Sequence, residues 1–205
     1  MTSTPKTKTQ NDIPVMLFKS QKDWTTWLDK NHAKSAGVWL QIAKKTGKVK
    51  TVTYAGALEV ALCYGWIDGQ GKGLDESAWL QKFTPRGPRS IWSKINRTKA
   101  MELIESGRMK PAGLAAIDRA KKNGRWAAAY DSHRTATVPV DLQSALDQNP
   151  KAQAFFDALD STNRYAILFR LQTAKKPETR ARRIEQFVRM LENHERIYPQ
   201  DYANH

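Results

Sequence analysis

The stretch that decides the fold is residues 54–96, which begins YAGALEVALCYGWIDGQ and ends AWLQKFTPRGPRSIWSKIN. Apolar side chains recur at helical spacing over its first ten residues. This predicts a helix that ends at Gly65, where a glycine easily adopts a left-handed backbone. Trp66 then starts a predicted strand, Asp68-Gly69 is a turn signal, and residues 78–83 are typical of the returning strand.

The residues before this stretch also contain signals for strands and helices. Residues 13–18 (IPVMLF) form a short candidate strand, which Pro14 would confine to a sheet edge. Ser20 can cap a helix over the following residues, and the alternating apolar residues of 37–45 predict a second strand. Thr53 is the predicted cap of the Tyr54 helix. The fold class is therefore α+β, with a small, mostly antiparallel sheet and packed helices.

The last third of the chain predicts only helices. Pro139 and Asn149-Pro150 are helix-start signals, and Ser161 or Thr162 is expected to cap the next helix. We therefore expect an all-α C-terminal helical unit over 138–195, after an α+β domain over 13–131. Residues 1–12 are expected to be a disordered tail and 196–205 a second tail.

Composition limits the classes of function. The 205 residues carry a formal net charge of +14, with ten lysines against three acidic residues in the first fifty. Such a charge attracts polyanions and favours solubility. The single cysteine, Cys63, excludes an internal disulfide and is interpreted as a buried small hydrophobe. No apolar run reaches the ~20 residues of a membrane span, and the polar start of the chain is unlike a secretory signal, so a cytoplasmic location is expected.

Motifs for catalysis and metal binding are absent. The four histidines are scattered, and neither paired cysteines nor nucleotide-binding glycine motifs occur, so no metal and no cofactor is expected. Asp68 is the one acidic residue considered as an acid or base, and a turn aspartate is the stronger interpretation. We assign no catalytic residue.

The segment between Glu76 and Glu102 has six basic residues and no acidic one. Within it, Arg86 and Arg89 could hold a phosphate or carboxylate while Trp92 supplies a stacking face. The alternative is structural, with Pro85 and Pro88 fixing a loop whose arginines form internal ion pairs. Both interpretations stay open at this stage. The candidate ligand-binding residues of the whole stretch are Tyr54, Trp66, Asp68, Arg86, Arg89, Ser90, Trp92, Lys94 and Asn96.

Several stretches of this chain resemble the YdeI/OmpD-associated family, also labelled bacteriocin-protection proteins. The matching stretches are ALCYGWIDGQ (61–70), FTPRGPRSIWSKIN (83–96), GRMKPAGL (107–114), AKKNGRW (120–126), VPVDLQSALDQNPKAQAFF (138–156) and TAKKPETRARRI (173–184). The family name implies a link to survival against antimicrobial peptides. The resemblance implies that seven residues match positions of the family's motif, without assigned roles. They are Trp66, Asp68, Arg86, Ser90, Trp92, Lys94 and Asn96.

Three hypotheses of function follow. The first is a non-enzymatic, stress-associated protein that binds a small anionic ligand or nucleotide at the loop of Arg86, Arg89 and Trp92. The second is non-specific nucleic-acid binding through the basic surface. The third is an enzyme that uses Asp68 as acid or base. A protein partner is not identified by the sequence.

Overall fold

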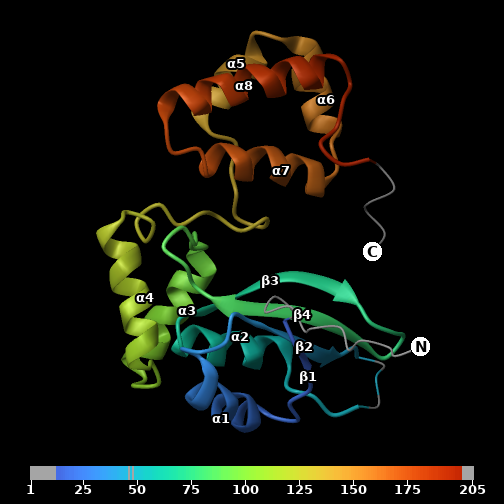
Figure 1. Ribbon diagram of the computed structural model, residues 1–205. Coiled ribbons are helices and arrows are strands. Elements are labelled where there is room, and N and C mark those ends of the chain that lie inside the picture. Colours follow the sequence, from blue (N-terminus) through green and yellow to red (C-terminus); the bar gives the residue numbers. More distant parts are fainter. Residues whose placement is uncertain (1–12, 46, 48, 200–205) are drawn as a thin grey trace, which may run out of the picture. The chain divides into compact units, whose positions relative to one another are not determined.

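The computed structural model describes residues 13–45, 47 and 49–199 (Figure 1). The tail expected over 1–12 and the end of the tail expected over 196–205 lie outside these residues. The chain folds as two compact units. Unit 1 consists of residues 1–90 and 98–126, and unit 2 of residues 91–97 and 127–205. The second unit therefore takes up a short segment from the middle of the chain before it takes up the whole C-terminal part.

Unit 1 is built on a four-stranded sheet in the order β1-β2-β4-β3. Its strands are β1 (Val15–Met16), β2 (Val38–Ala43), β3 (Trp66–Gly73) and β4 (Ala78–Pro85). β1 pairs with β2 in parallel at one edge, and the other two pairings are antiparallel. The predicted α+β class and the edge position of the first strand are confirmed.

Two helices, α1 (Gln21–Asn31) and α2 (Tyr54–Cys63), pack against one face of this sheet (Figure 1). The register sets Val38 opposite Phe83, so both side chains lie on that face. Trp24 of α1 is fully buried there, with its ring centroid 5.9 Å from that of Phe83. Its indole nitrogen donates to the Ala57 carbonyl oxygen at 3.1 Å, which ties α1 to α2.

The helix starts follow the sequence signals. Ser20 accepts a hydrogen bond from the Asp23 backbone, and Thr53 accepts one from the Gly56 backbone, as their predicted capping roles require. Gly65 has a φ of +70°, the left-handed conformation expected at the end of α2.

The predicted turn at Asp68-Gly69 is wrong. Both residues lie inside β3, which continues to Gly73 through a bulge between Asp68 and Gly71. The side-chain amide of Gln81 donates to the Gly69 carbonyl oxygen at 2.9 Å, which satisfies a group that the bulge leaves without a ladder partner. The chain instead reverses at Asp75, whose carboxylate accepts from the Ser77 and Ala78 backbone nitrogens at 2.7 and 2.8 Å.

Two further helices follow, α3 (Lys94–Glu105) and α4 (Pro111–Lys122). Ala100 and Leu103 of α3 are buried, as their spacing predicts. The same helical spacing in the sequence predicts an inward position for Ile95 and Ile104 too. This prediction is wrong, because they are 50% and 36% exposed. The buried face of α3 is therefore narrower than the helical repeat of apolar residues predicts.

Unit 2 contains α5 (Val140–Asp147), α6 (Pro150–Ala158), α7 (Ser161–Gln172) and α8 (Pro177–Glu192). Its core is built from Leu142, Leu146, Phe156, Ile167, Leu171 and Leu191 with their neighbours. Asn149 caps α6 as predicted, whereas the cap of α7 is Asp160 rather than Ser161 or Thr162. Residues 91–97 join this unit through backbone hydrogen bonds between Trp92, Lys94 and Tyr130.

Candidate functional site

The sequence-predicted residues Tyr54 and Asp68 meet in the structure. The Tyr54 hydroxyl donates to the Asp68 carboxylate at 2.6 Å, and the Tyr54 ring lies 5.8 Å from that of Trp79. The first residue of α2 is thereby fastened to β3. Asp68 therefore links a helix to a strand.

Trp66, another predicted site residue, is part of the core. It is 1% exposed, and its indole nitrogen donates to the His32 carbonyl oxygen at 3.1 Å. Its ring meets those of Trp24 and Trp27 edge-on at 6.1 and 5.9 Å. Such edge-to-face aromatic contacts stabilise a core beyond the area they bury.

Arg86, Arg89 and Ser90 lie on a short loop of unit 1 after β4. Arg86 is 5% exposed, its backbone nitrogen donates to the Gly65 carbonyl oxygen, and its own carbonyl oxygen accepts from Arg119. Ser90 closes the loop by accepting from the Gly87 backbone at 3.0 Å. Arg89 is exposed. Of the two arginines, Arg89 is therefore the one that faces solvent.

Trp92, Lys94 and Asn96 belong to unit 2. Trp92 is 2% and Asn96 is 9% exposed, and Lys94 forms an ion pair with Asp131 at 2.8 Å. A stacking platform needs an open ring face, which a side chain so deeply buried does not offer. The predicted combination of Arg86, Arg89 and Trp92 is thus divided between two units, with Arg86 and Trp92 nearly inaccessible.

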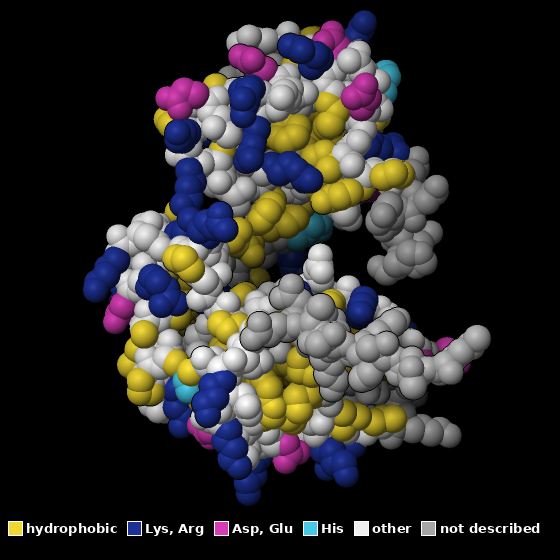
Figure 2. Space-filling model, viewed as in Figure 1, with side chains coloured by type: hydrophobic (Ala, Val, Ile, Leu, Met, Phe, Trp, Pro, Cys, Tyr) yellow, Lys and Arg dark blue, Asp and Glu magenta, His cyan; other side chains and the backbone are white. Residues whose placement is uncertain are grey.

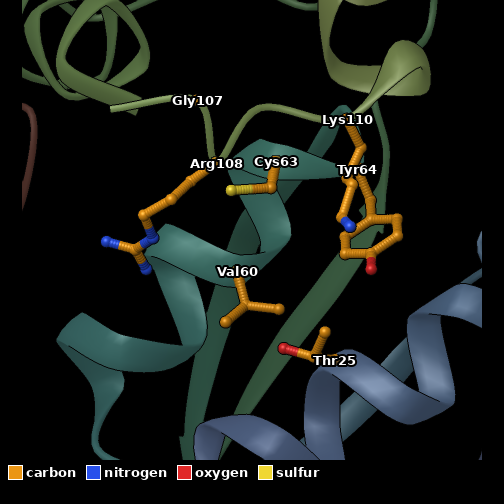
Figure 3. Close-up of a pocket in the computed structure, with 7 residues that line it drawn as sticks. All are labelled: Thr25, Val60, Cys63, Tyr64, Gly107, Arg108 and Lys110. Atoms are coloured by element: carbon orange, nitrogen blue, oxygen red, sulfur yellow. The ribbon is translucent and has the colours of Figure 1, made fainter. Parts of the chain in front are cut away.

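A cavity of about 240 Å³ in unit 1 brings together residues that the sequence did not single out as a site (Figure 3). We call it the α2-end pocket. Its lining comes from α1, from the end of α2 and from the loop between α3 and α4. The lining residues are Thr25, Val60, Cys63, Tyr64, Gly107, Arg108 and Lys110.

The loop that carries Arg108 and Lys110 is held by backbone hydrogen bonds. Gly107, with a φ of +67°, ends α3 and lets the Arg108 backbone nitrogen donate back to the Leu103 carbonyl oxygen at 3.0 Å. The Lys110 backbone nitrogen then donates to the Cys63 carbonyl oxygen at 3.1 Å. The backbone that carries these two cationic residues is thereby held beside the end of α2, and both residues line the pocket.

Two glycines allow α4 to approach α2 at this point. A Cβ atom on Gly113 would lie 2.4 Å from the Cys63 carbonyl oxygen, and one on Gly65 would lie 2.7 Å from that of Ala112. Gly65 belongs to the stretch 61–70 and Gly113 to the stretch 107–114. The pocket therefore forms where these two stretches meet.

The charges around the pocket favour an anion over a reactive thiol. Burial raises the pKa of the Cys63 thiol, an effect that the nearby Arg108 guanidinium only partly offsets. The thiol is therefore protonated at neutral pH, where a nucleophilic cysteine would be a thiolate. In Figure 3 the Cys63 sulfur points toward Arg108, and the Lys110 side chain runs beside the Tyr64 ring.

Polar neighbours fix two of the lining residues. Arg108 makes an ion pair with Glu59 of α2, with 3.2 Å between the guanidinium and the carboxylate oxygen. The Tyr64 hydroxyl donates to Asp29 of α1 at 2.5 Å, and burial followed by this hydrogen bond raises the pKa of Tyr64. Tyr64 is accordingly neutral, and its ring forms a fixed wall.

The sequence contains one signal for this site. GRMKPAGL sets two basic residues between a glycine helix stop and a proline helix start, a loop short enough to hold both in place. Its partner Cys63 is more than 40 positions away, however, and only the fold brings them together. In the described ranges no three His, Cys, Asp or Glu side chains cluster as metal ligands would. No described helix has the length and apolar character of a membrane span.

Comparison with known families divides the chain into two parts. Residues 135–194 match the family described as "Bacteriocin-protection, YdeI or OmpD-Associated", which confirms the resemblance over this segment; the match covers the four helices α5 to α8. Residues 16–116 match a "Domain of unknown function (DUF8412)", and this match contains the whole α2-end pocket. No curated protein and no solved structure matches the chain.

Proposed function

We propose that this protein binds a small anionic compound in the α2-end pocket, with Arg108 and Lys110 as its charge partners. The observation that carries the proposal is the pairing of two cationic side chains on a single cavity. A guanidinium presents several N–H donors in a plane that matches a carboxylate or phosphate. The Glu59 contact uses Nη2 of Arg108 and orients the group without neutralising the Lys110 charge.

The size of the cavity limits the ligand. A volume of about 240 Å³ corresponds to roughly eight water molecules at about 30 Å³ each. This suits a small carboxylate or phosphorylated compound rather than a dinucleotide. The Thr25 hydroxyl and the Tyr64 ring lie on the same cavity, and they could orient the uncharged part of the ligand.

The experiment compares two exposed arginines. The structure favours one of them as the partner of the anion, and the sequence alone favours the other. Arg108→Ala removes a pocket charge, and Arg89→Ala removes a charge from the loop favoured by sequence alone. Inorganic phosphate, citrate and AMP are titrated calorimetrically at low salt into the wild type and both variants. We expect at least one of them to bind the wild type, and Arg108→Ala to weaken it by at least tenfold, which is about 1.4 kcal/mol.

Arg89→Ala should leave the affinity unchanged, because Arg89 lies outside the pocket lining. An affinity lost in Arg89→Ala and retained in Arg108→Ala would return the site to the loop after β4. Wild-type protein that binds none of the three anions would refute the proposal in its present form.

The family description supports a cellular setting for this binding, protection against bacteriocins. A bacterial strain that lacks the gene should then be killed at a lower bacteriocin dose, and the wild-type gene should restore resistance. If the Arg108→Ala gene restores resistance equally well, anion binding and protection are separate properties.

A second candidate function, nucleic-acid binding, is favoured by one feature of the sheet. On the face opposite α1 and α2, the Lys72 and Lys82 ammonium groups lie 4.5 and 5.8 Å from the centre of the Trp39 ring. A base of a single strand could displace Lys72 from the Trp39 ring face, and the displaced ammonium group and that of Lys82 would then neutralise the neighbouring phosphates. Figure 2 shows other Lys and Arg side chains scattered over the visible face, which suits non-specific attraction.

This candidate is tested by fluorescence anisotropy with a labelled single-stranded oligonucleotide. The salt concentration is varied between about 50 and 200 mM, a range across which binding through phosphate contacts weakens steeply. We expect Lys72→Gln to reduce the salt dependence by about one phosphate contact, and Lys122→Gln, which removes an exposed charge from α4, to change it less. Equal effects of the two substitutions would attribute binding to net charge alone.

A further inference from the structure

Unit 2 contains a second cavity, of about 250 Å³, on one side of α7. We call it the α7 pocket, and its principal lining residues are His133, Thr162, Tyr165, Phe169, Arg170 and Tyr198. We propose that the α7 pocket binds a planar aromatic ring that bears a carboxylate or phosphate group. The ring would lie among the aromatic side chains, and its anionic group would meet Arg170.

Helical spacing builds one wall of this pocket. Tyr165 and Phe169 are one turn apart on α7, with 5.9 Å between their ring centroids, and the His133 ring meets Tyr165 edge-on at 5.3 Å. The Tyr165 hydroxyl donates to the Asp131 carbonyl oxygen at 2.9 Å, so the ring is fixed and its polar atom is satisfied. What remains facing the cavity is aromatic surface, which a second ring can stack against.

Tyr198 also lines the pocket, and a buried amide holds its backbone in place. Asn163 is 2% exposed, its side-chain oxygen accepts from the Tyr198 backbone nitrogen at 2.9 Å, and its amide nitrogen donates to the Tyr198 carbonyl oxygen at 3.2 Å. Tyr198 lies in the segment that the sequence predicted to be a tail. The Tyr198 residue itself is 37% exposed, so its ring is accessible while its backbone is anchored.

The charge at the pocket decides between two kinds of ligand. Aromatic clusters bind organic cations through their ring faces. Here, however, the Arg170 guanidinium lies over the Tyr198 ring, 5.7 Å from its centre, and donates through Nη1 to the Ala166 carbonyl oxygen at 3.0 Å. A fixed positive charge on the cavity repels a cation and attracts an anion. The ligand class is therefore an aromatic anion, such as an aromatic acid or a mononucleotide.

This inference does not rest on the anion site proposed above. The α2-end pocket is lined by residues of unit 1, and the α7 pocket by residues of unit 2. Arg108→Ala should therefore leave binding at the α7 pocket unchanged. A ligand whose affinity is reduced only by Arg108→Ala belongs to the first pocket and counts against the second.

The test uses the full chain with phenyl phosphate and AMP as probes, observed by saturation-transfer NMR and calorimetry. Adenosine supplies the ring without the charge, inorganic phosphate the charge without the ring, and phenyltrimethylammonium the opposite charge. Tyr198→Ala removes one wall, and Arg170→Gln removes the positive charge. Arg182→Gln, an exposed arginine of α8, is the matched charge control.

We expect both aromatic phosphates to bind the wild type more tightly than adenosine or inorganic phosphate. Tyr198→Ala should weaken both phosphates by at least fivefold. Arg170→Gln should weaken them by about tenfold, the loss expected for one charge-assisted contact, and leave adenosine unaffected, whereas Arg182→Gln should change nothing. The proposal is overturned if neither phosphate binds, if phenyltrimethylammonium binds as tightly as phenyl phosphate, or if Arg182→Gln has the effect of Arg170→Gln.

Discussion

Gly113 offers a direct test of the close approach of α4 to α2 on which the α2-end pocket depends. A Cβ atom at this position would lie 2.4 Å from the Cys63 carbonyl oxygen and 2.4 Å from the Met109 sulfur. Carbon and oxygen atoms normally stay about 3.3 Å or more apart. Gly113→Ala must therefore push the start of α4 away from the end of α2 by roughly 1 Å, because a backbone carbonyl cannot rotate aside as a side chain can.

The cost of that displacement can be bounded. Forcing a methyl group into a packed region costs about 1–3 kcal/mol, and alanine returns up to about 1 kcal/mol through its better helix propensity. The net loss of stability therefore lies between 0 and about 3 kcal/mol, and the middle of that range is roughly 1–2 kcal/mol. For a chain of this size each kcal/mol lowers Tm by about 2–4 °C, so Tm should fall by roughly 2–8 °C.

Gly56 supplies a matched control. Gly56 is the third residue of α2, as Gly113 is the third residue of α4. A Cβ atom on Gly56 would meet the side chain of Gln21, with the closest atom, the amide nitrogen, at 2.6 Å. Gln21 is exposed and its side chain can move away, so Gly56→Ala should leave the free energy of unfolding unchanged or raise it by up to about 1 kcal/mol.

The assay is urea unfolding of the wild type and both variants, followed by tryptophan fluorescence, together with the rate at which a disulfide reagent labels Cys63. Gly113→Ala should be less stable than Gly56→Ala and should label faster, because the displacement opens the pocket around the thiol. If the two variants are equally stable and label at the same rate, the approach of α4 to α2 is not what shapes the pocket.

Three further substitutions test other contacts. Tyr64→Phe removes the hydrogen bond to Asp29 and should cost about 1 kcal/mol in urea unfolding at pH 7. Because the pKa of Tyr64 is raised in the fold, its contribution is complete below about pH 10 and is lost as pH rises further, so wild type and variant should converge in alkali. Asp141→Asn breaks the two-point ion pair with Arg180, in which hydrogen bonding to the guanidinium lowers the pKa of Asp141. With Asp141 45% exposed, the cost should be only about 0.5–1 kcal/mol at pH 7, and it should vanish as pH falls from about 4 through the lowered pKa. Asn163→Ala should cost about 1–3 kcal/mol, because two backbone groups after α8 lose their partner, and limited proteolysis should then cut that segment faster.

Local signals in the sequence predicted most of the fold. Ser20, Thr53 and Asn149 each accept the hydrogen bond that their cap positions require. Periodicity identified the helices and strands because it reflects which side chains are buried against one packed layer. The turn signal at Asp68-Gly69 was wrong. There the Tyr54 hydroxyl bonds to Asp68 and the Gln81 amide bonds to Gly69, and both contacts stabilise the strand instead.

The candidate site was far less accessible from the sequence. A basic segment with an interspersed tryptophan suggested stacking, but Trp92 is 2% exposed and cannot offer an open face. Cys63 was correctly interpreted as buried. Its position beside Arg108 and Lys110 depends on the packing of α4 against α2, which joins residues more than 40 positions apart. A pattern that looks a few residues ahead contains no information on such a contact.

The path of the chain between the two units also bears on how such genes can change. The two family matches, over 16–116 and 135–194, do not overlap, so recombination between genes could exchange them separately. Residues 91–97 lie in the first match, yet they fold with unit 2, where Trp92 and Lys94 exchange backbone hydrogen bonds with Tyr130. A gene spliced between the two matches would deliver the second domain without these residues. The second segment alone would therefore lack the backbone partners of Tyr130.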